Sequence, residues 1–205
     1  IEFCHMVMGP TCGMILGDLG ADVIKVEPIA GDTTRRLVHQ GAGFFASYNR
    51  NKRSLALDLK SGNGLRVAEA LCENADVVVE NLRPGALEEL GLGYAALSEK
   101  NSGLIYCALK GFLDGPYAHR KALDEVVQMM GGLAYMTGPE GRPLRAGASV
   151  TDIMGGMFGV IGIMSALRKR EHTGRGEQVM AALYETTVHM VTQHMMQYVV
   201  TGVPT

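Results

Sequence analysis

The stretch SLALDLKSGNGLRVAEALCENADVVVE, residues 54–80, contains a strand pattern, a helix pattern and a second strand pattern in direct succession. Apolar residues alternate over residues 54–59, as they do in a strand. They then recur at helical spacing over residues 65–75, and DVVVE at 76–80 forms a short apolar run. This order predicts two strands joined by a crossover helix, a connection that makes the strands parallel.

The segments on both sides repeat this alternation. Toward the N-terminus, strand patterns at 1–8 and 22–27 flank a short helix pattern at 11–19. Toward the C-terminus, short helices are expected at 84–90 and 94–100, strands at 104–109 and 177–181, and helices at 123–133, 153–170 and about 184–200. The sequence predicts an α/β fold with a doubly wound, mostly parallel sheet flanked by helices, in one domain over residues 1–205.

Composition narrows the classes of partner. With 47% apolar residues, a net charge of -2 and a pI near 6.3, the chain lacks the basic character typical of nucleic-acid binding. The longest apolar run, 153–167, is shorter than the roughly 20 residues of a membrane span, so we expect no membrane segment. Both ends of the sequence look cut, at Ile1 inside a strand pattern and at Thr205 just after a helix pattern.

The four cysteines, at positions 4, 12, 72 and 107, form no Cys-x-x-Cys pair. We interpret them as reduced core residues of a cytoplasmic protein. His189 and His194 lie five residues apart, so they do not share one helix face, and no third ligand accompanies them. The sequence predicts no metal site.

Ligands of doubly wound sheets bind at the carboxyl ends of the strands. The loop containing Gly9 and Gly13 lacks the spacing of a dinucleotide motif and reads as a plain strand–turn–helix. Cations in such loops can bind the phosphates of a nucleotide-like ligand or can be ordinary surface charge, and the pattern leaves both open. The best candidate is Lys110, which ends an apolar strand; the others are Arg35, Arg36, Lys52, Arg53, Lys60 and Arg83.

Asp152 directly precedes a glycine-rich helix pattern, IMGGMFGVIGIM. Each interior glycine costs a helix about 1 kcal/mol relative to alanine, so several together indicate close approach of another backbone. At the start of this helix, Asp152 can act as an N-cap residue, or its carboxylate can be a nucleophile that the helix dipole keeps ionised. The residue pattern alone leaves both roles open.

Short segments in a fixed order resemble the class III coenzyme A transferases, the CaiB–BaiF family, which also includes α-methylacyl-CoA racemases. The resemblance covers nearly all 205 residues. The matching segments are Gly9-Pro10, 19–27, Gly31-Asp32, Arg35, 51–54, 57–60, 75–81, Pro84-Gly85, Lys110-Gly111 and 173–176.

This resemblance implies that Asp152 is the catalytic nucleophile, which attacks an acyl-CoA to give a mixed anhydride and free CoA, and that the product forms through an aspartyl-CoA thioester. Coenzyme A is thus expected as a substrate, with no permanently bound cofactor. Similarity to the formyl-CoA transferases of the family places CoA along His5, Met6, Val7, Met8, Leu57, Lys60, Asn81, Leu82 and Lys110. Two arginines of that pattern are replaced here by Pro28 and Glu89.

One position separates transferase from racemase. Racemases carry a histidine immediately before the position of Asp124, and here that residue is Leu123, which cannot move protons. Glu125 lies where transferases carry a catalytic glutamate, so acyl transfer to a small carboxylic acid is favoured. A racemase and a non-catalytic nucleotide-binding domain remain the alternatives. The resemblance further implies an interlocked homodimer and a smaller C-terminal domain, which we expect to lie outside these 205 residues.

Overall fold

The computed structural model describes residues 1–203 and contains one sheet of six strands in the order β3-β2-β1-β4-β5-β6. Every adjacent pair of strands is parallel. The strands are β1 (Glu2–Phe3), β2 (Val23–Glu27), β3 (Lys52–Ala56), β4 (Val77–Glu80), β5 (Ile105–Lys110) and β6 (Gln178–Ala182). The predicted parallel, doubly wound α/β fold is confirmed.

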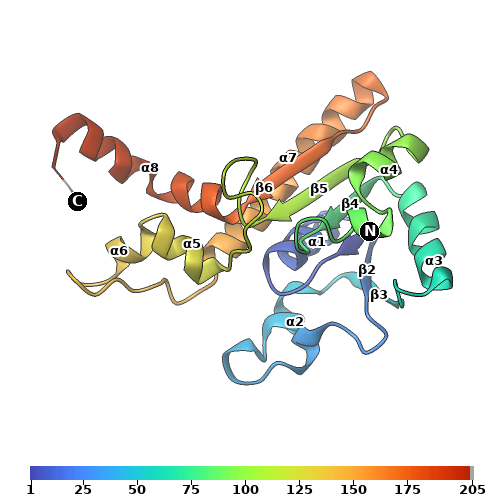
Figure 1. The fold of residues 1–205 in the computed structure, drawn as a ribbon, viewed down its shortest axis with the longest axis horizontal. Helices are drawn as coiled ribbons and strands as arrows, with labels where there is room; N and C mark the ends of the chain where they lie inside the picture. The colour runs from blue at the N-terminus through green and yellow to red at the C-terminus, as the bar shows by residue number, and fades with distance from the viewer. Residues whose placement is uncertain (204–205) are drawn as a thin grey trace.

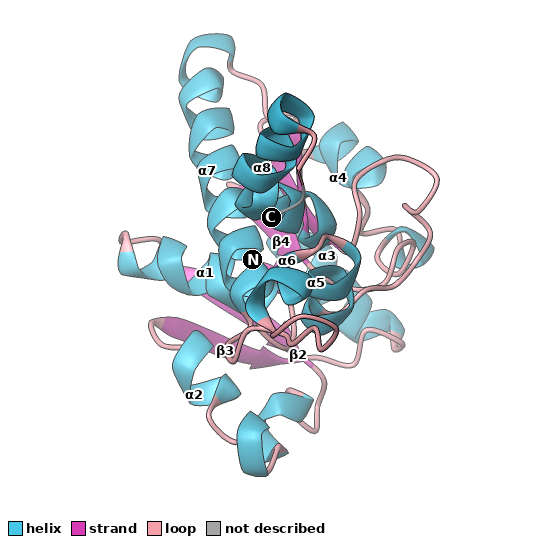
Figure 2. Ribbon diagram, turned by 90° about the vertical axis from the view of Figure 1, so that its left-hand side faces the viewer, coloured by secondary structure: helices cyan, strands magenta, loops and turns pink. Residues whose placement is uncertain are grey.

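Helices cover both faces of this sheet, as Figures 1 and 2 show. The longer ones are α1 (Met8–Asp18), α3 (Gly62–Glu73), α7 (Val150–Thr173) and α8 (Leu183–Thr201). The shorter ones are η1 (Thr33–Arg36), η2 (His39–Gly41), α2 (Phe44–Tyr48), η3 (Glu88–Leu90), α4 (Tyr94–Lys100), α5 (Asp124–Met130) and α6 (Leu133–Thr137). In Figure 1, α5, α6 and α8 extend together to one side of the sheet.

Strand β5 shows why the apolar runs form a doubly covered sheet. Side chains alternate between the faces of a strand, so Ile105 and Cys107 pack with α1 and α7, whereas Tyr106 packs with α3 and α4. Each of these side chains is fully buried. A strand that is buried on both faces needs the continuous apolar run seen in LIYCAL.

Several element boundaries differ from the sequence prediction. Strand β1 has two residues, and α1 begins at Met8 with Pro10 in its first turn, where a missing N–H is harmless. Only η3 forms in the expected helix 84–90, and the expected helix 123–133 divides into α5 and α6 at Gly132, whose φ is +87°. Strand β3 ends at Ala56, so Leu57 and Lys60 lie in the following loop.

The glycine-rich pattern does reflect close packing. Helix α7 crosses α1 so closely that a Cβ atom at Gly156 would lie 2.6 Å from the Met8 carbonyl oxygen. By length and composition α7 could also cross a membrane, but its glycine face packs against α1 and β5 inside the domain. The glycines thus let α7 seat its N-terminal turn beside the start of α1.

Candidate active site

The order of the strands reverses between β1 and β4, because the chain builds outward from β1 to β3 and then returns to β4. Such switch points open a crevice at the carboxyl ends of the strands. Here two residues just past the ends of these strands are joined by two hydrogen bonds: the His5 N–H donates to Asn81 Oδ1, and Asn81 Nδ2 donates to the His5 carbonyl, both at 2.9 Å. Two cavities meet at this crossing.

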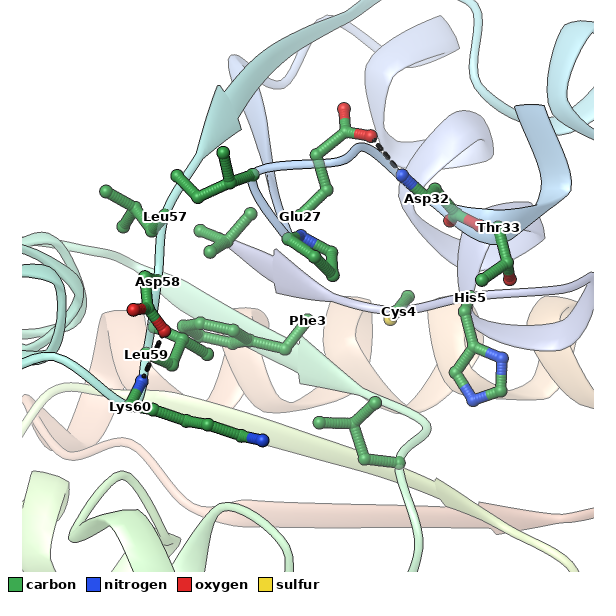
Figure 3. A pocket seen from close by; sticks show the side chains of 14 residues that line it. Phe3, Cys4, His5, Glu27, Asp32, Thr33, Leu57, Asp58, Leu59 and Lys60 are labelled. Carbon is green, nitrogen blue, oxygen red and sulfur yellow. Dashed lines mark hydrogen bonds between the residues drawn. The ribbon is translucent and has the colours of Figure 1, made fainter. Parts of the chain in front are cut away.

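The first cavity has a volume of about 720 Å³. Of the predicted site residues it contains His5, Leu57, Lys60 and Leu82. Figure 3 shows Leu57 and Lys60 at one wall and His5 and Thr33 at the other. The lining is mainly apolar, as suits a planar ring system, and has a lysine at its edge.

The second cavity has a volume of about 500 Å³ and shares His5 and Leu82 with the first. The other predicted residues all line it: Met6, Val7, Met8, Asn81, Lys110, Glu125 and Asp152. Met6 has a φ of +62°, a conformation that non-glycine residues rarely adopt and that clusters at functional sites. The structure therefore brings every predicted site residue to one of two adjoining cavities, and the role of each residue stays a prediction.

The two lysines of the predicted site differ in their surroundings. The Lys110 amine lies 2.5 Å from Glu80 Oε1 and donates to the Leu82 carbonyl at 3.0 Å. Burial raises the pKa of Glu80, although Lys110 opposes the shift. The Lys110 charge is balanced inside the protein, so the geometry favours a role in positioning Leu82 over the expected phosphate contact. Lys60 is exposed and, within residues 1–203, makes no ion pair.

Most of the other basic side chains considered as phosphate ligands also form ion pairs with carboxylates of the protein. The Arg35 guanidinium holds the pKa of Glu27 down at about 2. The pairs are Arg35 with Glu27, Lys52 with the buried Glu2, Arg53 with Asp22 and Arg83 with Glu89. Among residues 1–203, no group of three or more His, Cys, Asp or Glu side chains is arranged to hold a metal ion.

Asp152 is not the N-cap of α7. The N-cap is Ser149, and Asp152 is the third helical residue. The free N–H groups of this turn are used by Asp124 of α5, whose Oδ2 accepts from the Thr151 N–H at 2.9 Å, the Thr151 hydroxyl at 2.5 Å and the Asp152 N–H at 3.3 Å. The helix terminus therefore stabilises the Asp124 carboxylate and does not offer these donors to a ligand.

This arrangement also corrects the expectation that the helix dipole keeps Asp152 ionised. Burial first, and then the nearby carboxylates of Asp124 and Glu125, raise the pKa of Asp152 to about 7, and Arg145 only partly opposes them. A carboxyl group with such a pKa is half ionised at neutral pH. Burial and, after it, the Asp152 charge also raise the pKa of Tyr48, which places the end of α2 near this carboxyl group.

Asp124 is the site residue that sequence reasoning missed. Its side chain is 3% exposed, whereas that of the predicted catalytic residue Glu125 is 49% exposed. Asp124 also lies 3.4 Å from Arg145 and accepts a hydrogen bond from the buried Gln128. The only sequence signal was an acidic pair at a helix start, which does not tell which carboxylate faces inward.

Comparison with known proteins gives consistent matches. A model of the family described as CoA-transferase family III matches residues 1–204. The succinyl-CoA:glutarate CoA-transferase of Mus musculus is 40% identical over 207 residues, which cover 98% of this chain and 48% of the relative. The formyl-CoA:oxalate CoA-transferase of Rhodopseudomonas palustris (strain TIE-1) is 41% identical over 196 residues, which cover 93% and 46%.

A comparison with solved structures agrees with these sequence matches. The crystal structure of a CAIB/BAIF family protein from Brucella suis superimposes with a TM-score of 0.93 at 38% identity, over 100% of this chain and 57% of that one. The chain spans about half the length of the curated relatives it matches.

Proposed function

Because this chain belongs to CoA-transferase family III, we propose that the full-length protein moves coenzyme A from an acyl-CoA thioester to a carboxylic acid, with Asp152 as the residue that takes the acyl group. The observation that carries the proposal is the pair of adjoining cavities that share His5 and Leu82. Lys60 lines the first cavity and Asp152 lines the second. An extended CoA can thus lie with its nucleotide in the first cavity and its thioester in the second.

Asp152 starts the proposed reaction in its ionised form. A carboxylate oxygen attacks the thioester carbonyl carbon, the C–S bond breaks, and the CoA thiolate leaves with the electron pair, which gives a mixed anhydride. The thiolate then attacks the Asp152 carbonyl carbon and expels the donor as a free carboxylate. The acceptor carboxylate attacks the carbonyl carbon of the resulting aspartyl thioester and expels the CoA thiolate, which gives a second mixed anhydride. The thiolate then attacks the acceptor carbonyl carbon of this anhydride, so the acceptor leaves as its CoA thioester and Asp152 is restored as a carboxylate.

Neighbouring groups assist by position and charge. The pKa of Asp152, about 7, means that a proton is easily lost at neutral pH while the carboxylate is more basic than an ordinary aspartate. Asp124 fixes the backbone of Thr151 and Asp152 by accepting from both of their N–H groups, and it also accepts from the Thr151 hydroxyl. We propose that it positions the nucleophile.

The identity of the acids is part of the proposal. The relatives are named for succinyl-CoA with glutarate, succinyl-CoA with L-malate and formyl-CoA with oxalate. Small dicarboxylic acids are therefore the first donors and acceptors to test with this protein.

The experiment is CoA exchange between two acids by the full-length protein and its Asp152→Ala variant. We expect exchange by the unmodified protein, no exchange by Asp152→Ala, and unchanged exchange by a control, Asp114→Ala, which removes an exposed acid outside both cavities. Exchange retained by Asp152→Ala would refute the mechanism. Binding of NAD but not CoA in calorimetry would favour the non-catalytic alternative.

The racemase is the second candidate, because a carboxyl group with a pKa of about 7 also suits proton transfer at an α-carbon. Leu123 lines the cavity where a second proton-transfer group would be needed. We therefore expect no deuterium uptake at the α-carbon of a 2-methylacyl-CoA in D₂O. Uptake without CoA exchange would favour the racemase.

We also propose that the full-length protein is an interlocked homodimer. Large apolar side chains are exposed along α5 and α8, including Met129, Met195 and Val199, at 50%, 52% and 73%. These helices extend to one side of the sheet in Figure 1, and so much exposed apolar surface is typical of an interface. Sedimentation velocity of the full-length protein tests this proposal, and a monomer at micromolar concentration would contradict it.

A further inference from the structure

Arg145 lies in the irregular segment between α6 and α7 and lines the cavity that contains Asp152. Its two neighbours are anchored: the Leu144 N–H donates to the Ala134 carbonyl at 3.0 Å, and the Ala146 N–H donates to Gln128 Oε1 at 2.8 Å. Gln128 is fully buried. The backbone at Arg145 is therefore held in place by α5 and α6, although its side chain is 40% exposed.

The guanidinium of Arg145 has hydrogen-bonding capacity to spare. Arginine has five N–H donors. Nε donates to the Ala146 carbonyl at 3.0 Å, Nη2 lies 3.4 Å from Asp124 Oδ1, and Nη1 lies 3.9 Å from Glu125 Oε2. The last two distances are longer than those of a close ion pair, such as the 2.8 and 2.7 Å bonds from Arg35 to Glu27. A further carboxylate can thus be bound without breaking a strong pair.

The charges around the cavity give a reason for such a cation. Asp124, Glu125 and Asp152 all line it, so an incoming carboxylate meets an acidic surface. Of the cations that line it, Lys110 is paired with Glu80 and Arg83 with Glu89. Arg145 and Lys121 remain, and within residues 1–203 Lys121 makes no ion pair.

The position of Arg145 matches the second carboxylate of a substrate. The Asp124 carboxylate lies between Arg145 and the backbone of Asp152. Its Oδ1 faces the Arg145 guanidinium, and its Oδ2 accepts from the Asp152 N–H. A molecule with one carboxyl group reacting at Asp152 can therefore direct another to Arg145. We propose that Arg145 binds the distal carboxylate of a dicarboxylic acid and sets the preference for such acids, an inference that rests on the proposed CoA transfer.

The test compares acceptors that differ only at the far end, succinate against butyrate and glutarate against valerate, with the full-length protein and one acyl-CoA donor. We expect Arg145→Gln to raise the KM of the dicarboxylic acids about 10- to 100-fold, as loss of one charge-assisted contact implies. The KM of the monocarboxylic acids and of the donor should change little. Arg142→Gln is the matched control, since Arg142 is exposed on the same segment and does not line the cavity.

Three outcomes would overturn the assignment. In the first, the unmodified protein shows no preference for dicarboxylic acids. In the second, Arg145→Gln lowers kcat equally for every acceptor, which indicates a purely structural role through Asp124. In the third, Lys121→Gln causes a larger selective loss for dicarboxylic acids than Arg145→Gln does. Each of these requires measurable exchange by the unmodified protein. Absence of exchange with every acceptor would instead refute the proposed function.

Discussion

Replacement of Asp124 by asparagine should make Asp152 more acidic. In the native protein the pKa of Asp152 is raised from 3.8 to about 7 by burial first and by the Asp124 charge second. An asparagine keeps the side-chain oxygen that accepts from the Thr151 N–H, and asparagine and aspartate are similarly good acceptors at a helix terminus. The substitution therefore removes the charge, together with the second oxygen, Oδ1, which accepts from Gln128 and faces Arg145.

The size of the effect follows from the order of these causes. A neighbouring charge within a few ångströms typically shifts a carboxyl pKa by about one unit or more. Burial remains in the variant, so the pKa should fall by about one unit and stay above 3.8. Glu125 is a smaller cause and is 49% exposed, so Glu125→Gln should shift it less.

The assay is the pH profile of kcat/KM for CoA exchange by the full-length protein, because its acidic limb reports the ionisation of the free enzyme. The limb should lie near pH 7 in the unmodified protein and about one unit lower in Asp124→Asn. Asp124→Ala is the control for the structural role, since it also removes the acceptor at the helix start and should cost about 0.5–2 kcal/mol of stability.

The ionisation of Asp152 should also make the free energy of unfolding depend on pH. Because the folded pKa of Asp152 exceeds 3.8, the folded state binds more protons between pH 3.8 and about 7. Protonated Asp152 therefore favours the folded state: this stabilisation is fully present below pH 3.8 and is lost as the pH rises from 3.8 to about 7. An acidic limb that stays at pH 7 in Asp124→Asn, but moves in Glu125→Gln, would refute the reasoning and identify Glu125 as the carboxylate that raises the pKa of Asp152.

Three further substitutions test the rest of the site. Lys60→Ala should weaken CoA binding about tenfold in calorimetry, because a charge-assisted phosphate contact is lost, and unchanged affinity would remove Lys60 from the site. Lys110→Ala should lower the free energy of unfolding by about 3 kcal/mol, since it leaves Glu80 buried without its cation. Adding Glu80→Gln should restore part of this stability. Weaker CoA binding at unchanged stability would instead support a phosphate contact by Lys110. Gly156→Ala should cost about 1–3 kcal/mol in urea unfolding, because its Cβ would meet the Met8 carbonyl oxygen, and an unaffected midpoint would contradict the packing of α7 on α1.

The fold was predictable because strand periods and helix periods alternate in the sequence with few interruptions. The apolar run at 104–109 is typical of a strand covered on both faces, and β5 is such a strand. The predicted element boundaries were wrong where tertiary contacts, and not the local sequence pattern, decide where an element ends. Alternation continues past Ala56, for example, but the pairing of β3 with β2 ends there.

The residues named from the sequence line two adjoining cavities, but their contacts could not be predicted, and their roles stay predictions. The ordered motifs placed His5, Asn81 and Asp152 near one another, and the strand order explains why they meet. Sequence could not show that Lys110 is paired with Glu80, or that Asp124 uses the N–H groups expected to serve Asp152. Both facts depend on which side chains face inward across elements that are distant in sequence.

The central claim is that Asp152 carries the acyl group and then CoA. The direct measurement is to incubate the full-length protein with an acyl-CoA, trap the activated carboxyl group with hydroxylamine, and locate the resulting hydroxamate by peptide mass spectrometry. We expect an aspartyl hydroxamate at Asp152 that forms only when acyl-CoA is present. Modification of a different carboxyl group, or full CoA exchange with Asp152 unmodified, would contradict the mechanism.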